Sequence, residues 1–242
     1  MKIIYAILLL SFLQVPVCNI EVDVPRNTTK FSQLLIPVWV SLQLEDYEKA
    51  GRYAEQFFDL YEPEFIDQAD YDEVWTKHLY EDISELESTI SLGNYEEAMD
   101  ITNCLMNHMS LWHKATGQEY YFDKIWDFAQ RYQELNIVIN NFYLCHYEWN
   151  TVEQFIEELN KSWAILESTP VNLYGFDFDE SPDYSSIEEH KRNISLCLQE
   201  FNSQLVDADR GVLANRCNEI QPNLIKLVSL FGQFRMGKAF LS

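Results

Sequence analysis

Glycine and proline are both scarce in this chain, with seven of each among 242 residues. Folds built from many strands rely on these two residue types for their tight turns, so the scarcity argues against a sheet-rich protein. The rest of the chain has long stretches rich in Glu, Leu, Ala and Gln, and 47% of its residues are hydrophobic, ample for a core. We therefore expect an all-α fold.

Basic residues are also few, with 17 Lys and Arg against 39 Asp and Glu, for a net charge of -22. The acids are spread along the chain rather than gathered in a tail. Such a surface repels phosphate backbones and anionic lipid heads, so we expect no nucleic-acid partner. Acidity of this kind is typical of a solvated helical exterior, and it would also attract cations or a basic protein.

The common catalytic motifs are missing as well. The chain contains no Gly-rich phosphate loop, no Gly-x-Ser-x-Gly, no His-Glu-x-x-His and no Cys-x-x-Cys-His. The adjacent pairs Glu157-Glu158 and Glu188-Glu189 point to different helix faces, and the Glu-x-x-His motif of di-iron bundles does not occur. We predict neither an enzyme nor a bound cofactor.

The N-terminus has the pattern of an export signal. Lys2 precedes an apolar run from Ile3 to Val17, which is too short for a comfortable membrane span. We predict a signal over residues 1–18 and a periplasmic, cell-surface or secreted location. Cys18 stands where a lipoprotein signal has its acylated residue; acylation there, ordinary cleavage nearby and an uncleaved anchor all stay open. We expect membrane contact only through a lipid anchor at Cys18.

Hydrophobic periodicity and local punctuation divide the rest into helices. Gly93-Asn94, Gly117 and Thr169-Pro170 mark helix ends. The expected helices cover 30–45, 47–61, 73–91, 94–115, 119–147, 151–168, 185–205 and 208–231.

Internal similarity suggests how these helices are grouped. LEDYEKA at Leu44–Ala50 recurs as LGNYEEA at Leu92–Ala98, and shifts of 102 and about 113 residues align the first half with the second. We predict a duplicated antiparallel helical bundle with two units of about four helices, at 28–118 and 119–234, and an acidic loop at 171–184. The two units would pack as one elongated bundle or as two bundles side by side. The spacing of 48 between hairpins is far from the ~34 of a tetratricopeptide solenoid.

Two segments carry a resemblance. GQEYYFDKIWDF (Gly117–Phe128) and IQPNLIKLVSLFGQF (Ile220–Phe234) resemble stretches of uncharacterised exported bacterial helical-bundle proteins. With the repeats, the resemblance covers about a third of the chain. A His and a Met tend to follow the first segment in those proteins, whereas Ala129 and Gln130 follow Phe128 here. The resemblance implies export and a helical bundle, and it brings no known activity.

The stretch NCLMNHMSLWH, from Asn103 to His113, concentrates soft-metal ligands on one expected helix. At about 100° per residue, Leu105 and Met109 belong to a core stripe, and the sulfur and imidazole groups divide between its two edges. One edge carries Met106, Met109 and His113, a set that would suit copper(I). The other carries Cys104 and His108, which need a neighbouring helix to complete a site. The alternative is a packed helix face without metal.

The acidic loop has the spacing of a calcium ligand set. Asp177, Asp179, Ser181, Asp183 and Glu188 take positions 1, 3, 5, 7 and 12 of an EF-hand loop. Pro182 stands where that loop requires a glycine with positive φ, which proline cannot adopt. An acidic surface loop without calcium is the alternative.

The cysteines are even in number once Cys18 is set aside. Cys197 and Cys217 lie ten residues either side of Asp207, where the last hairpin is expected to turn, so we predict a disulfide between them. Cys104 and Cys145 form the residual pair.

These features favour an exported, non-enzymatic helical protein that acts as a binding or scaffold module for a protein partner. The alternative is a metal-handling bundle for copper or calcium.

Overall fold

A computed structural model describes residues 28–65, 73–140, 149–176, 184–205, 210–232 and 234. Every regular element in these ranges is a helix, which confirms the all-α prediction. In chain order the helices are α2 (Thr28–Gln43), α3 (Tyr47–Phe65), α4 (Glu73–Ser91), α5 (Tyr95–Ala115), α6 (Tyr121–Asn140), α7 (Trp149–Ser168), α8 (Tyr184–Ser203), α9 (Arg210–Asn218) and α10 (Gln221–Ser229). None of the described helices is long and apolar enough to cross a membrane.

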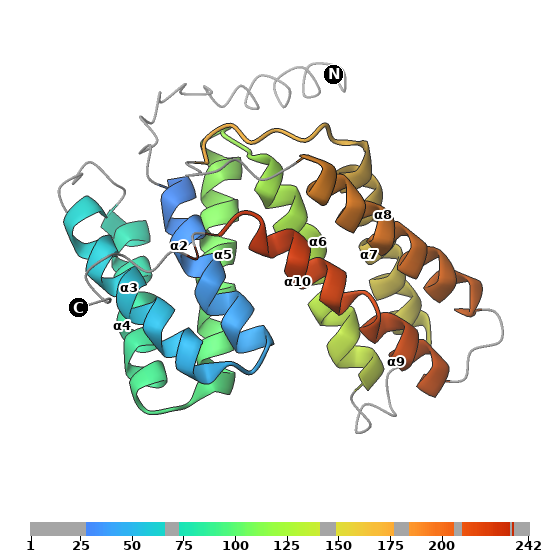
Figure 1. The fold of residues 1–242 in the computed structure, drawn as a ribbon, viewed down its shortest axis with the longest axis horizontal. Coiled ribbons are helices and arrows are strands. Elements are labelled where there is room, and N and C mark those ends of the chain that lie inside the picture. The colour runs from blue at the N-terminus through green and yellow to red at the C-terminus, as the bar shows by residue number, and fades with distance from the viewer. Residues whose placement is uncertain are drawn as a thin grey trace, which may run out of the picture.

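Helix α2 lies between α3, α5 and α10 (Figure 1). Every residue from Thr28 to Leu42 except Lys30 is buried. A helix that is buried on all sides needs neighbours on all sides, and α3, α5 and α10 pack around this one. Helix α2 is thus the buried helix against which the N-terminal half packs.

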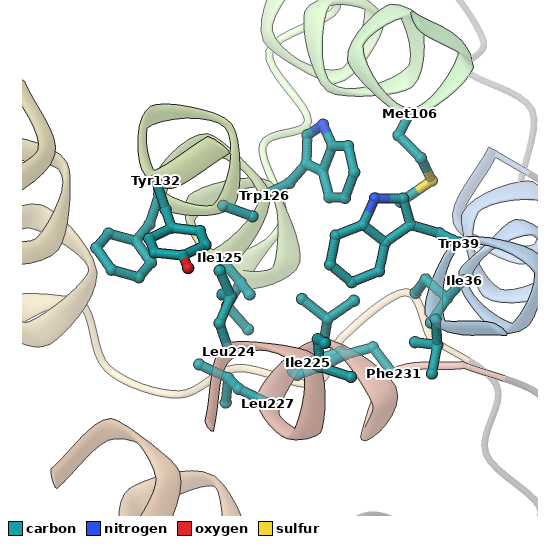
Figure 2. Packing of buried hydrophobic residues seen from close by; sticks show 14 of the residues in the cluster. Ile36, Trp39, Met106, Ile125, Trp126, Tyr132, Leu224, Ile225, Leu227 and Phe231 are labelled. Atoms are coloured by element: carbon teal, nitrogen blue, oxygen red, sulfur yellow. The ribbon is translucent and has the colours of Figure 1, made fainter. Parts of the chain in front are cut away.

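Helix α10 joins the two halves of the chain. It packs against α2, α6 and α8 and crosses in front of α6 in Figure 1. In Figure 2 its residues Leu224 and Ile225, with Phe231 just beyond it, face Trp39 of α2 and Trp126 of α6. The buried hydrophobic residues form one cluster that runs through both halves. The structure therefore does not confirm the predicted arrangement of two duplicated units.

The repeated sequences LEDYEKA and LGNYEEA fold into the same turn. Leu44, Glu45 and Asp46 donate backbone hydrogen bonds four, three and five residues back, and Leu92, Gly93 and Asn94 do the same. This is the Schellman pattern, in which one residue takes a left-handed conformation. That residue is Glu45 (φ 55°) in the first turn and Gly93 (φ 73°) in the second.

Two predicted boundaries need correction. The helix expected over 208–231 is two helices, because Pro222 begins a new helix at the first turn of α10. The loop expected at 171–184 is not wholly a surface loop. Its first part packs Val171, Leu173 and Phe176 against the core, with Phe176 5.7 Å from Phe122 between ring centroids.

Candidate functional site

Helix α5 carries the stretch NCLMNHMSLWH, and its polar side chains divide by face. Asn103 and Asn107, one turn apart, each accept a hydrogen bond from a buried indole: Trp39 Nε1 lies 2.9 Å from Asn103 Oδ1, and Trp126 Nε1 lies 2.7 Å from Asn107 Oδ1. The two indoles meet edge to face at 5.5 Å. These asparagines therefore accept the hydrogen bonds that the two buried indole N–H groups need.

The edge that carries Met106, Met109 and His113 is buried. Met106 lies beside Trp39 in Figure 2, and Met106 and Met109 are each at most 2% exposed. His113 is also 2% exposed, and its Nδ1 lies 2.8 Å from Asp123 Oδ1 of α6. Burial gives the two methionines a packing role, and the imidazole is paired with a carboxylate.

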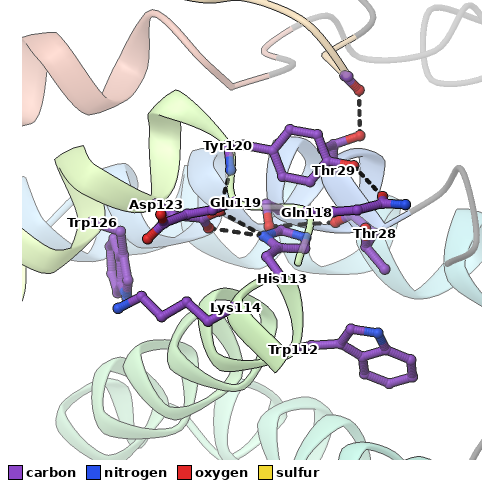
Figure 3. A network of polar contacts seen from close by, with 12 residues as sticks. Thr28, Thr29, Trp112, His113, Lys114, Gln118, Glu119, Tyr120, Asp123 and Trp126 are labelled. Carbon is purple, nitrogen blue, oxygen red and sulfur yellow. Dashed lines mark hydrogen bonds and ion pairs between the residues drawn. The ribbon is translucent and has the colours of Figure 1, made fainter. Parts of the chain in front are cut away.

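The His113–Asp123 pair fixes the turn between α5 and α6 (Figure 3). Asp123 also accepts the backbone N–H of Tyr120 at 2.7 Å, which caps the start of α6. The Tyr120 ring packs edge to face on the imidazole at 4.6 Å. His113 thus has a structural role that its spacing on α5 did not reveal, because Asp123 belongs to the next helix.

The opposite edge of α5 meets helix α4. Cys104 Sγ lies 3.8 Å from Asp82 Oδ2 and 3.8 Å from Nε2 of His108. Nδ1 of His108 lies 3.2 Å from Asp82 Oδ2. We call Asp82, Cys104 and His108 the α4–α5 cluster; their ligand atoms all lie within 4.8 Å of one another. The neighbouring helix that this edge required is therefore present.

The α4–α5 cluster is open to solvent and acidic. Cys104 is exposed, and the side chains of His108 and Asp82 are 28% and 24% exposed. Partial burial, followed by the nearby carboxylates of Asp82 and Glu85, raises the pKa of the Cys104 thiol. Both carboxylates therefore place negative charge beside the sulfur.

Asp82 was missed from the sequence, although a simple signal marks it. Cys104 follows the turn residue Gly93 by 11 positions, and Asp82 precedes Gly93 by the same 11 (104 − 93 = 93 − 82). In an antiparallel hairpin, residues equidistant from the turn lie at one level. Counting the same number of residues on either side of Gly93 would therefore have identified Asp82 as the residue opposite Cys104.

The predicted disulfide between Cys197 and Cys217 is wrong, because both are free thiols. Their helices are neighbours as expected, since Arg216 of α9 pairs with Glu200 of α8 at 2.9 Å. However, Cys197 Sγ donates to the carbonyl of Glu219 at 3.6 Å, whereas Cys217 is fully buried. The two cysteines therefore lie on neighbouring helices as expected, but their side chains do not point toward each other.

Several other candidates lie outside the described residues: Cys18, the whole of 1–18, Cys145, and Asp177, Asp179, Ser181 and Asp183 of the calcium pattern. Glu188, its last member, is described. It lies in the first turns of α8, where Lys191 Nζ is 3.2 Å from its Oε1.

The two repeated turns meet at one end of the N-terminal half. The Tyr47 and Tyr95 rings stack at 4.1 Å with an angle of 4° between their planes. The leucine three residues before each tyrosine is exposed, Leu44 by 61% and Leu92 by 81%. We call these four residues the paired-turn surface.

Comparisons with family models, with curated proteins and with solved structures found no match for this chain.

Proposed function

We propose that this protein is an exported, non-enzymatic binding module that holds a protein partner on the paired-turn surface. The observation that carries the proposal is the exposure of Leu44 and Leu92 beside the stacked tyrosines. Scattered exposed leucines are ordinary on a protein surface, whereas these two occupy equivalent positions in two repeated turns that the Tyr47–Tyr95 stack holds together.

The charge around this surface indicates the kind of partner. The two repeats, 44–50 and 92–98, contain five acidic residues and one lysine, and that lysine is paired with Asp46 at 2.5 Å. A segment with apolar side chains flanked by Lys or Arg is complementary to such a surface. Charges of this kind chiefly set the association rate and partner choice, while the leucines would supply affinity through burial.

Selection of peptides from a displayed random library on the purified chain tests this proposal. Full burial of a leucine is worth about 1.5–3 kcal/mol, so the double variant Leu44→Ser/Leu92→Ser should weaken selected peptides by at least about tenfold. The matched control is Leu111→Ser/Ile137→Ser, which removes two leucine-sized side chains exposed by 54% and 62% elsewhere.

The expected peptides combine Lys or Arg with apolar residues, and they bind the control variant as tightly as the wild type. Peptides that bind both double variants equally, or that lack basic residues, would contradict the proposal.

A further inference from the structure

The α4–α5 cluster joins three classic types of metal ligand from two helices: a carboxylate, a thiol and an imidazole. We propose that Asp82, Cys104 and His108 bind a divalent transition-metal cation, with zinc as the preferred ion. This site is separate from the paired-turn surface and does not depend on the proposed partner.

The spacing of the three groups fits tetrahedral zinc. Zinc binds sulfur at about 2.3 Å and nitrogen or oxygen at about 2.0–2.2 Å, which places neighbouring ligand atoms about 3.3–3.7 Å apart. Here Sγ lies 3.8 Å from Oδ2 and 3.8 Å from Nε2, while the other ring nitrogen, Nδ1, lies 3.2 Å from Oδ2. With one ligand atom from each residue, the three atoms lie within 4.8 Å of one another. Binding through one imidazole nitrogen therefore requires the three ligand atoms to draw together from separations of at most 4.8 Å.

The ligand types decide which ion. Calcium and magnesium prefer oxygen ligands throughout, and copper(I) prefers thiolates and thioethers. One sulfur, one nitrogen and one oxygen form the mixed set that zinc accepts, with three protein ligands and a fourth position open to solvent. Water, or the exposed carboxylate of Glu85 one turn along α4, can fill that position.

Helix geometry holds the site in place. Cys104 and His108 are four residues apart on α5 and therefore share one face. Their neighbour Leu105 is fully buried, as is Leu86 on α4, so core packing sets the distance between the two helices. Binding would release the thiol proton to solvent and leave the thiolate on the metal.

Titration of the purified full chain with zinc alone, in excess magnesium and against a competing chelator, tests the proposal. One zinc should bind per chain and raise the melting temperature. Cys104→Ser, His108→Gln and Asp82→Asn should each lower the zinc affinity at least about tenfold, since even loss of a group that only hydrogen-bonds to a metal ligand costs about that much. Cys197→Ser, which removes another partly exposed thiol beside carboxylates, should leave it unchanged.

Cobalt(II) gives a second readout that does not depend on variant stability. The wild type loaded with cobalt should show a sulfur-to-metal charge-transfer band in the near ultraviolet, and Cys104→Ser should lose that band while its far-ultraviolet circular dichroism is unchanged. Zinc that magnesium displaces, zinc binding that survives Cys104→Ser, or cobalt without the band would overturn the proposal, because each indicates adsorption to the acidic surface.

Discussion

Replacement of Asn103 by alanine removes the hydrogen-bond acceptor of one buried indole, that of Trp39. The indole of Trp39 is 1% exposed, and its N–H donates to Asn103 at 2.9 Å. Removal of the acceptor leaves a buried donor unsatisfied, at a cost of about 1–3 kcal/mol. We take about 2 kcal/mol as the expected loss in the free energy of unfolding, which lowers the melting temperature by roughly 4–8 °C for a chain of this size.

Guanidinium unfolding followed by tryptophan fluorescence, together with calorimetry, measures this loss. A double-mutant cycle with Trp39→Phe supplies the control, since phenylalanine fills most of the indole site and has no N–H to satisfy. Asn103→Ala should then cost less than about 0.5 kcal/mol in the Trp39→Phe background, well below its cost in the wild type. Equal costs in the two backgrounds would refute the reasoning, because the hydrogen bond would then contribute nothing.

Three further predictions concern backbone conformation and buried thiols. Glu45→Gly should stabilise the protein by about 0.5–1 kcal/mol in chemical denaturation, because Glu45 has φ 55° where the equivalent turn has Gly93; a loss of stability would contradict the assigned conformation. Gly175→Ala should destabilise by about 2 kcal/mol or more, since φ is 88° and a Cβ would clash with the ring of Tyr120; an unchanged melting temperature would be inconsistent with that clash. Burial raises the pKa of Cys217 from 9.0 to about 12, so iodoacetamide at pH 8 should modify Cys104 and Cys197 long before Cys217 unless the chain is unfolded.

The burial of Cys217 also predicts how the stability of the protein changes at alkaline pH. Cys217 is neutral when protonated, and its folded pKa lies above the unfolded value of 9.0. The buried thiol therefore makes its full contribution to the free energy of unfolding below about pH 9, and this contribution is lost as the pH rises from 9 toward 12. Burial shifts the pKa of Tyr132, which lies near Cys217, in the same direction. Unfolding in guanidinium across this range should show a steady decrease in stability, and a flat profile would contradict the burial of these groups.

Local signals predicted most of the helices. Gly93 and Gly117 end helices in left-handed conformations, as their positions implied. Pro222 was an equally clear signal that went unused, and it divides the last predicted helix. Helix existence follows from periodicity and caps, which the sequence displays residue by residue.

The arrangement of helices was harder to predict, because it depends on contacts between distant segments. Sequence similarity between the halves suggested two units of about four helices, whereas α10 packs on both α2 and α6 and joins the two halves in one core. The wrong pairing of Cys197 with Cys217 has the same cause. Spacing about Asp207 placed Cys197 and Cys217 at one level, and only the packing of α9 on α6 turns Cys217 inward.

The candidate sites divide along the same line. Helical angles separated the buried edge of α5 from the edge that carries Cys104 and His108. The partner residues Asp123 and Asp82 come from other helices, so the pattern within α5 could not identify them. For Asp82 the register of the hairpin about Gly93 would have been enough.

Zinc binding by the cluster of Asp82, Cys104 and His108 is the most specific property proposed for this protein. X-ray absorption at the zinc edge, on the full chain loaded with one equivalent of zinc, tests whether the ion is bound through the sulfur of this cluster. We expect one sulfur at about 2.3 Å and nitrogen or oxygen neighbours at about 2.0–2.2 Å, with the sulfur absent in Cys104→Ser. A spectrum with oxygen neighbours alone, identical in wild type and variant, would contradict the claim.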